Sequence, residues 1–114
     1  NAAGISTRGT LEDTTVDLWD NIFAVNVRGP FILTQEVVRI MKRQQTRGSI
    51  VNILSTAVHC GAATIMAYSA SKAALGILTR NVAHALRFNR IRVNGINMGR
   101  ADTVGEHTVQ AADG

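Results

Sequence analysis

The hydrophobic and polar residues along this chain follow two periods, one typical of helices and one of buried strands. Apolar residues at i, i+3 and i+4 predict a helix over residues 16–27, and Thr15 suits its N-cap. Pro30 suits the first turn of a second helix, which extends to about residue 44. The almost continuous apolar run 49–55 is typical of a parallel strand that is covered on both faces.

The second half of the chain repeats this order of elements. A loop over residues 56–67 leads into a third predicted helix over residues 68–88, and a second strand covers residues 90–97. Helices that alternate with apolar strands predict an α/β fold with a parallel sheet in a single domain. Two such strands cannot pair their outer edges by themselves, so we expect further strands from a longer parent chain.

Three residues of this pattern suit proton transfer. Tyr68 and Lys72 stand four residues apart at the start of the third predicted helix. Positions i and i+4 lie on one face of a helix, so a phenol and an ammonium can share a pocket there. A phenol ordinarily titrates near pH 10, and a neighbouring cation favours its ionised form. Ser55 ends the apolar strand and can hydrogen-bond a substrate oxygen, which suits carbonyl and alcohol chemistry.

An asparagine on an apolar stripe and a run of small residues add to this constellation. Asn26 falls on the apolar face of the first predicted helix, where an amide must find hydrogen-bond partners in the interior. It is a satisfied core amide, a helix terminator or part of a site. The chain opens with Asn1-Ala2-Ala3-Gly4, and we interpret this run as a turn of short side chains that lets backbone approach a ligand.

Nearly the whole chain resembles the short-chain dehydrogenase/reductase family in its motifs, which are Asn1-Ala2-Ala3-Gly4, Asn26, Ser49-Ile50-Val51-Asn52-Ile53-Leu54-Ser55, Tyr68-Ser69-Ala70-Ser71-Lys72 and Ile91-Arg92-Val93-Asn94. The resemblance implies a doubly wound parallel sheet, the Rossmann NAD(P)-binding fold. It implies an oxidoreductase that moves hydride between NAD or NADP and a small carbonyl or alcohol substrate. We expect residues 1–114 to be a fragment of that single domain, its C-terminal half, lacking the Gly-rich N-terminal half that holds the dinucleotide.

The resemblance also implies a role for each member of a catalytic tetrad. Tyr68 would be the general acid/base, and Lys72 would favour the ionised phenol and bind the nicotinamide ribose. Ser55 would orient the substrate. Asn26 would position a water in the proton relay.

Further residues are implied to contact the cofactor. The opening segment would lie against the adenine-ribose side, through Asn1, Ala2, Ala3 and Gly4. Gly99 and Thr103 would match a Pro-Gly-x-x-x-Thr segment that contacts the nicotinamide, with Met98 at the proline position. The choice between NAD and NADP stays open, because the residues that read the ribose 2′ position would precede Asn1.

Two other functions stay open. Epimerases and dehydratases among the extended relatives of the family reuse the same Tyr and Lys, although the motif Tyr-Ser-Ala-Ser-Lys favours a dehydrogenase. A non-catalytic fragment could instead act as a packing or oligomerisation module. The third predicted helix carries small residues that permit close helix packing. The corresponding helices of the family form dimer and tetramer interfaces, so the resemblance implies a homodimer or homotetramer of the full-length protein, although packing within one subunit accounts for the small residues equally well. These small residues are Ala70, Ala73, Ala74 and Gly76.

Composition and charge narrow the partners and the compartment. The 114 residues are 46% hydrophobic and 18% charged, with a net charge of +4, as in a globular domain. The basic cluster at residues 39–47 suits the C-terminal end of a helix and has no interleaved aromatic residues, so we expect no nucleic-acid partner. No apolar run reaches the roughly 18 residues that span a membrane, and no zinc-ligand spacing occurs. A single cysteine, Cys60, fits a reducing compartment, so we expect a cytoplasmic protein.

Overall fold

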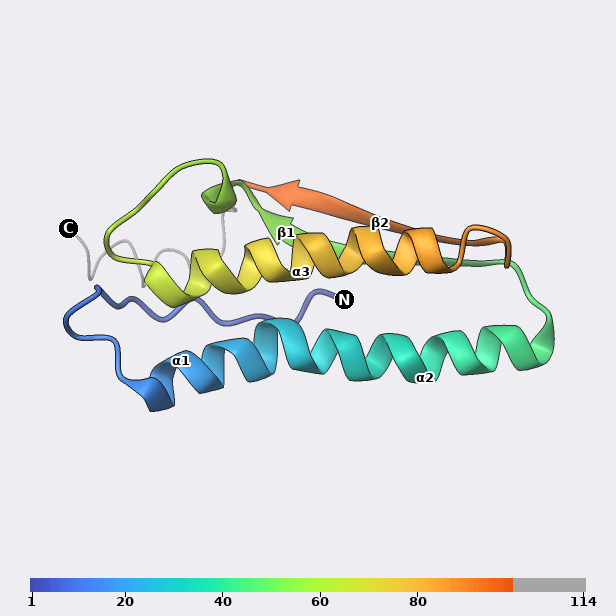
Figure 1. Ribbon diagram of the computed structural model, residues 1–114, viewed down its shortest axis with the longest axis horizontal. Helices are drawn as coiled ribbons and strands as arrows, with labels where there is room; N and C mark the ends of the chain where they lie inside the picture. The colour runs from blue at the N-terminus through green and yellow to red at the C-terminus, as the bar shows by residue number, and fades with distance from the viewer. Residues whose placement is uncertain (100–114) are drawn as a thin grey trace.

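The computed structural model describes residues 1–99, and helices and strands follow each other there in the order that the sequence predicts. The elements are α1 (Val16–Phe23), a π-helical turn (Ala24–Arg28), α2 (Gly29–Gln44), β1 (Gly48–Ser55), a 3₁₀ turn (Thr56–Val58), α3 (Met66–Ala85) and β2 (Ile91–Met98). Figure 1 shows α1 and α2 as one long rod, α3 across the opening segment from it, and the two strands next to α3. The predicted α/β class is confirmed.

The rod of α1 and α2 is continuous, whereas the sequence predicts a break before Pro30 (Figure 1). Ala24, Arg28 and Gly29 all have right-handed helical backbone angles, and the Gly29 N–H donates to the Ala24 carbonyl five residues earlier. In a regular α-helix the ring of a proline clashes with the carbonyl four residues before it. The wider π turn relieves that conflict, so the chain stays helical through the proline.

The two strands are parallel and pair in register along all eight residues of each. The other edge of β1 is met by the first residue of the chain. The Asn1 amino group donates to the Val51 carbonyl at 2.6 Å, and the Ile53 N–H donates to the Asn1 carbonyl at 3.1 Å. This is the bonding pattern of a parallel neighbour. Part of the edge that we expected to need a partner is thus covered by residue 1.

The hydrophobic core lies at the end of the molecule where the strands begin. Its buried members come from both strands and the end of α3, and they are Ile50, Leu86, Ile91 and Val93. Side chains alternate between the faces of a strand. On β1, Ile50 and Asn52 are buried, whereas Val51 on the opposite face is 37% exposed. The prediction that both faces are covered is therefore not met by residues 1–99.

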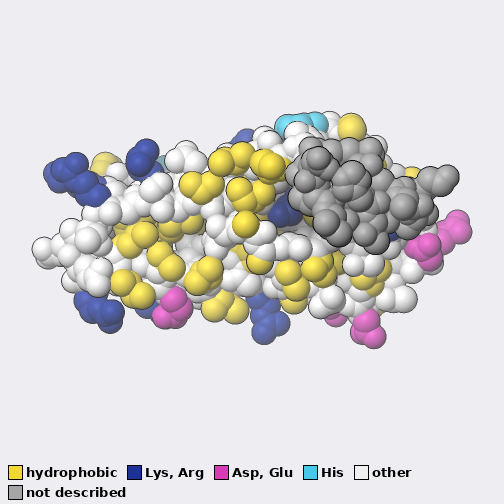
Figure 2. Space-filling model, turned by 180° about the vertical axis from the view of Figure 1, so that it is seen from behind, with side chains coloured by type: hydrophobic (Ala, Val, Ile, Leu, Met, Phe, Trp, Pro, Cys, Tyr) yellow, Lys and Arg dark blue, Asp and Glu magenta, His cyan; other side chains and the backbone are white. Residues whose placement is uncertain are grey.

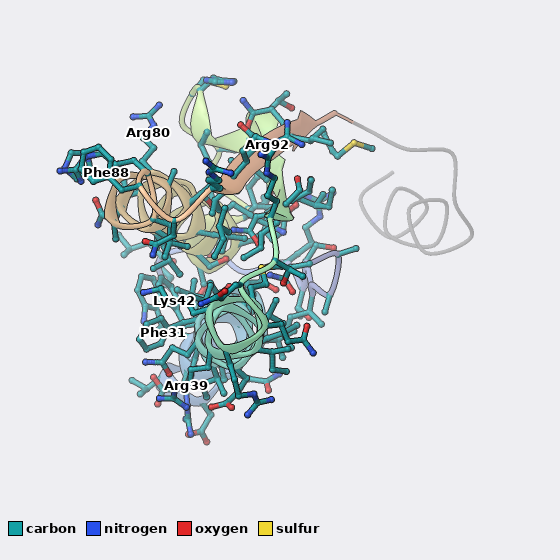
Figure 3. All side chains as sticks on the ribbon, turned by 90° about the vertical axis from the view of Figure 1, so that its right-hand side faces the viewer. Phe31, Arg39, Lys42, Arg80, Phe88 and Arg92 are labelled. Atoms are coloured by element: carbon teal, nitrogen blue, oxygen red, sulfur yellow. The ribbon has the colours of Figure 1, made fainter. Side chains whose placement is uncertain are left out.

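Charge is distributed unevenly along the long axis. Lys and Arg gather toward the end where α2 passes into β1, and Asp and Glu gather toward the opposite end (Figure 2). Figure 3 looks onto the basic end and shows Arg39, Lys42, Arg80 and Arg92 around α2, α3 and β2. Residues 37–99 contain no Asp or Glu, so the sequence itself sets this asymmetry.

Candidate active site

A cleft of about 430 Å³ opens where both strands end. Its walls come from Ser6 and Arg8 before α1, Ser55 at the end of β1, Tyr68 in the first turn of α3 and Gly99 just after β2. Open α/β sheets bind their ligands outside the carboxyl ends of the strands. The structure therefore brings the predicted site residues Ser55, Tyr68 and Gly99 to one place, at the edge of the sheet where a ligand is expected.

Ser55 is the last residue of β1, and it is buried. Its Oγ accepts a hydrogen bond of 3.1 Å from the Ala57 N–H and so caps the 3₁₀ turn. A serine hydroxyl has one hydrogen and two lone pairs, so this bond leaves the hydrogen for another acceptor. The hydroxyl is held by the backbone and can donate to an oxygen in the cleft.

Tyr68 is half-buried at the wall of the cleft. Ser71 Oγ donates to the Tyr68 carbonyl at 2.7 Å within the first turns of α3. Just before Tyr68, the Met66 N–H donates to the Gly9 carbonyl at 3.3 Å, which ties the start of the helix to the opening segment. The backbone that carries the phenol is thus fixed on both sides of the residue.

Lys72 lies one turn further along α3 and is 6% exposed. Its Nζ donates to the carbonyl of Ile53 at 2.9 Å, two residues before Ser55 on β1. Burial lowers the pKa of Lys72 from its ordinary value of 10.5, because the charged form loses hydration. Lys72 is not among the residues that line the cleft, and the contact that fixes its ammonium is the one to β1.

Asn26 lies in the π turn and is fully buried. Its Oδ1 accepts from the Ile5 N–H at 2.8 Å, and its Nδ2 donates to the Ile5 carbonyl and to Ser71 Oγ, both at 3.0 Å. The amide is therefore satisfied in the interior, and it does not end the helix. Since both amide hydrogens are in use, a water would have to meet the second lone pair of Oδ1 or a backbone carbonyl of the π turn.

Residues 1–4 do not form the turn that the sequence predicts, because Asn1 pairs with β1 and the segment has no regular secondary structure. The Asn1 side chain donates to Asn52 Oδ1 at 2.8 Å. Gly4 does not have a positive φ, so this position does not need the backbone freedom of glycine. It matters instead because glycine has no side chain. A Cβ at Gly4 would lie 3.4 Å from both Asn26 Oδ1 and Lys72 Nζ. The small residue lets the chain pass close to two buried polar groups.

Two residues that we had given no role belong to this region. Ser71 is fully buried and links the amide of Asn26 to the carbonyl of Tyr68. Its position between Tyr68 and Lys72, on the inner side of an amphipathic helix, is a signal that could have identified it. Arg8 lines the cleft from a segment without regular structure, where no periodicity indicates which way a side chain points.

Three further expectations concern Thr103, a metal site and a membrane span. Thr103 falls outside the described residues. Within residues 1–99, no three His, Cys, Asp or Glu side chains gather in a way that could hold a metal ion. The helices of this described part are too short or too polar to cross a membrane.

Comparison with known proteins gives a consistent result. L-xylulose reductase of Caenorhabditis elegans is 44% identical over 97 residues, which is 85% of this chain and 39% of that protein. Carbonyl reductase [NADPH] 2 of Sus scrofa is 36% identical over 110 residues, which is 90% of this chain and 45% of that protein. A crystal structure of NAD⁺-bound xylitol dehydrogenase superposes with a TM-score of 0.86 at 32% identity, over 96% of this chain and 42% of that one.

The chain thus spans less than half the length of these relatives. Solved structures of Rossmann-like dehydrogenases match nearly all of it, which confirms the predicted fold class. Which part of the longer relatives it corresponds to stays a prediction. A family model described as short chain dehydrogenase matches residues 1–114, and the chain belongs to the short-chain dehydrogenase family.

Proposed function

We propose that this chain carries the catalytic groups of an NAD(P)-dependent oxidoreductase that interconverts a small carbonyl compound and its alcohol. The observation that carries the proposal is the meeting of Ser55 and Tyr68 in one cleft, with the ammonium of Lys72 bonded to β1 two residues before Ser55. A hydroxyl donor and a phenol that face the same space can share one substrate oxygen.

Each group has a separate task in this proposal. Ser55 donates its hydroxyl hydrogen to the substrate oxygen and so fixes the carbonyl. Tyr68 gives its proton to that oxygen during reduction and takes it back during oxidation. A nicotinamide, when bound, supplies or accepts the hydride at the carbonyl carbon. Lys72 supplies positive charge next to the carboxyl end of β1.

The residues present fit a dinucleotide. An ammonium has three hydrogens, and the bond to the Ile53 carbonyl uses one, so Lys72 has donors for ribose hydroxyls. The opening segment has small, exposed residues at Ala2, Ala3 and Gly4, and Gly4 passes beside that ammonium. Gly99 lines the same cleft. Relatives are named for NADPH or bound to NAD⁺, and either cofactor is compatible with these residues.

Asn26 is proposed to hold the relay in place. Its amide fixes Ile5 and Ser71, and Ser71 in turn bonds the Tyr68 carbonyl. A proton that leaves Tyr68 has to be replaced from solvent, and a water beside Asn26 and Lys72 would provide that route.

We propose a second copy of this chain as the partner for the outer face of the helices. A hollow of about 630 Å³ there is lined mostly by apolar side chains of the rod and of α3, with Asp20 and Arg28 also in its wall. The apolar side chains include Phe23, Val27, Phe31 and Leu78. Phe31 is 43% exposed and Ile77 on α3 is 54% exposed. Apolar surface of this kind marks interaction sites, and a two-fold axis would pair it with itself.

The exposed thiol of Cys60 and the absence of a second cysteine favour the cytoplasm.

The test uses the protein expressed from its complete natural reading frame. Oxidation of NADH and NADPH is followed with a panel of ketones and aldehydes, for the parent and for Tyr68→Phe. We expect Tyr68→Phe to lower kcat by about 10²- to 10⁴-fold while the affinity for the dinucleotide changes little. Equal rates for the two proteins would refute the role of Tyr68. Absence of turnover with folded parent protein would instead favour a packing module, and conversion of a nucleotide sugar without net oxidation would indicate an epimerase or dehydratase.

A further inference from the structure

A hollow of about 380 Å³ lies at the basic end of the molecule, where the strands begin. One of its walls is the end of α2 with the connection to β1, and the other is the turn between α3 and β2. Its cationic and aromatic side chains are Lys42, Arg47, Phe88 and Arg90, and we call this group the basic hollow. The cleft opens where the strands end, so the two sites lie at opposite ends of the sheet.

The two walls of the basic hollow are fixed to each other by backbone hydrogen bonds. The Gly48 N–H donates to the Arg90 carbonyl at 3.3 Å, and the Asn89 N–H donates to the carbonyl of the core residue Leu86 at 2.9 Å. Arg90 has a φ of 58°, in the left-handed region that favours glycine. An arginine thus stands at a turn position where glycine is the easier residue, which points to a use for its side chain.

The three cations of the basic hollow are available to a ligand. Lys42, Arg47 and Arg90 are exposed, and their side chains make no hydrogen bond or ion pair with any residue of the described range 1–99. Residues 37–99 contain no Asp or Glu, and the acidic side chains gather at the far end of the molecule (Figure 2). Like charges without counter-charges repel one another, and a bound anion relieves that repulsion. The basic hollow is therefore complementary to an anion.

Phe88 adds an apolar group to the same hollow. It is 85% exposed, which is the highest exposure of a large hydrophobic side chain in the described part of the chain. Figure 3 looks onto this end and shows Phe88 pointing outward from the end of α3. The guanidinium of Arg87 lies 4.6 Å from the centre of the ring. A small soluble anion gains nothing from an outward ring, whereas a lipid surface offers anionic headgroups next to apolar chains.

We propose that this end of the molecule docks on an anionic membrane surface, with a lipid phosphate in the basic hollow and the ring of Phe88 among the headgroups. Contact of this kind lies in the plane of the membrane surface and needs no spanning helix. The anionic leaflet of a cell membrane faces the cytoplasm, which is the compartment proposed above. The inference is independent of the proposed oxidoreductase activity.

The position of the basic hollow suits such docking. Its walls are turns at the ends of the strands, and further strands of a longer chain pair along the edges of a sheet rather than at the ends of its strands. A rim of turns is therefore open to a flat surface. Because the cleft opens at the other end of the strands, docking leaves it facing the solution.

The test measures co-sedimentation of the protein, expressed from its complete natural reading frame, with vesicles of phosphatidylcholine alone or mixed with phosphatidylserine. We expect binding to the mixed vesicles, and we expect added salt to weaken it. Arg47→Gln and Arg90→Gln should each lower the partition coefficient about fivefold. Phe88→Ala should lower it by about three- to tenfold, and Phe88→Trp should preserve it.

Matched controls separate the basic hollow from net charge and from folding. Arg28→Gln removes an exposed cation of the π turn, and Leu11→Ala removes a leucine that is 78% exposed outside the hollow. Each control should change the partition coefficient by less than about twofold. Thermal unfolding shows whether each variant is folded. If the arginine variants do not fold, Phe88→Trp decides, because its emission should shift to the blue with the mixed vesicles and stay unchanged with phosphatidylcholine alone.

Four outcomes would overturn the proposal. The first is a parent protein that binds neither vesicle, or both equally. The second is an equal loss in Arg28→Gln and Arg90→Gln, which would indicate an effect of net charge alone. The third is calorimetric binding of glycerol phosphate that Arg90→Gln removes, without vesicle binding, which would assign the hollow to a soluble phosphate compound. The fourth is tighter binding of a single-stranded oligonucleotide that depends on Phe88, which would assign it to a nucleic acid.

Discussion

The two ends of the molecule are held together by different kinds of interaction. Where the strands begin, buried apolar side chains pack against one another in the core of Ile50, Leu86, Ile91 and Val93. Where the strands stop, polar side chains are buried beside apolar ones such as Ala67, and four of these polar side chains have specific hydrogen-bond partners. These are Asn26, Ser55, Ser71 and Lys72.

This difference shows how the fold separates stability from chemistry. Apolar packing depends on volume and tolerates exchange of one hydrophobic side chain for another of similar size. A buried polar group depends on one partner at one distance, and its free energy rises when that partner is lost. The cleft end is therefore specified by individual bonds, whereas the core end is specified by shape and area.

Between the two ends, a chain of polar side chains joins the sheet to α3. Asn1 donates to Asn52, Asn52 donates to Thr79 at 2.9 Å, and Thr79 donates to the Leu75 carbonyl at 2.8 Å. All of these groups are satisfied, so the chain holds the opening segment in register with β1. The register in turn sets where Gly4 and residues 5–9 lie against the site.

The largest effect should come from the Asn26 amide, which bonds the backbone of Ile5. We expect Asn26→Ala to lower the free energy of unfolding by about 3–5 kcal/mol, because three hydrogen bonds are lost and the backbone groups of Ile5 are left without a partner. Urea unfolding of the variant and of the parent measures this. Asn81→Ala, at an exposed position of α3, is the matched control and should change stability by less than about 0.5 kcal/mol. Equal losses in the two variants would mean that the bonds of Asn26 do not specify the cleft end.

A substitution in the core should lower the free energy of unfolding slightly less, and it should not change substrate binding at the cleft. Leu86→Ala removes a buried side chain next to Ile91 and should lower the free energy of unfolding by about 2–4 kcal/mol. Leu11→Ala, at a leucine that is 78% exposed, is the control. In the folded Leu86→Ala protein, KM for a ketone should stay within about twofold of the parent. A larger change in KM would show that the two ends are coupled and would break the comparison.

The same difference explains how far the sequence predicts the structure. Periodicity gave the elements of the core end, because a helix or strand that buries one face repeats its apolar residues. The motif residues Ser55, Tyr68 and Lys72 could be placed because each lies at a defined point of a regular element. The continuous helix through Pro30 and the path of residues 5–9 could not be predicted, since a π turn and an irregular segment have no period. Their geometry depends on bonds to residues distant in sequence, such as Asn26 to Ile5 and Gly9 to Thr64.

The smallest expected effect concerns Lys72, which is a buried cation among the polar groups of the cleft end. Burial lowers its pKa in the folded protein below the ordinary value of 10.5, which it keeps when the chain is unfolded. Between these two pKa values the unfolded state binds more protons than the folded state. The free energy of unfolding therefore rises with pH across that window, by at most about 1.4 kcal/mol per pH unit, and the gain is complete above 10.5.

Lys72→Met removes this proton and should remove the rise. Urea unfolding of parent and variant at a series of pH values up to 10.5 isolates the contribution, because all other titrating groups are common to both. Loss of the bond to the Ile53 carbonyl also destabilises the variant, but at pH values where the lysine stays charged it shifts the curve without changing its slope. Lys42→Met removes an exposed lysine at the basic end and should leave the pH dependence of the parent unchanged. If the curves of the parent and of Lys72→Met run parallel, the ammonium is as well solvated as that of Lys42, and the cleft end does not hold a buried charge.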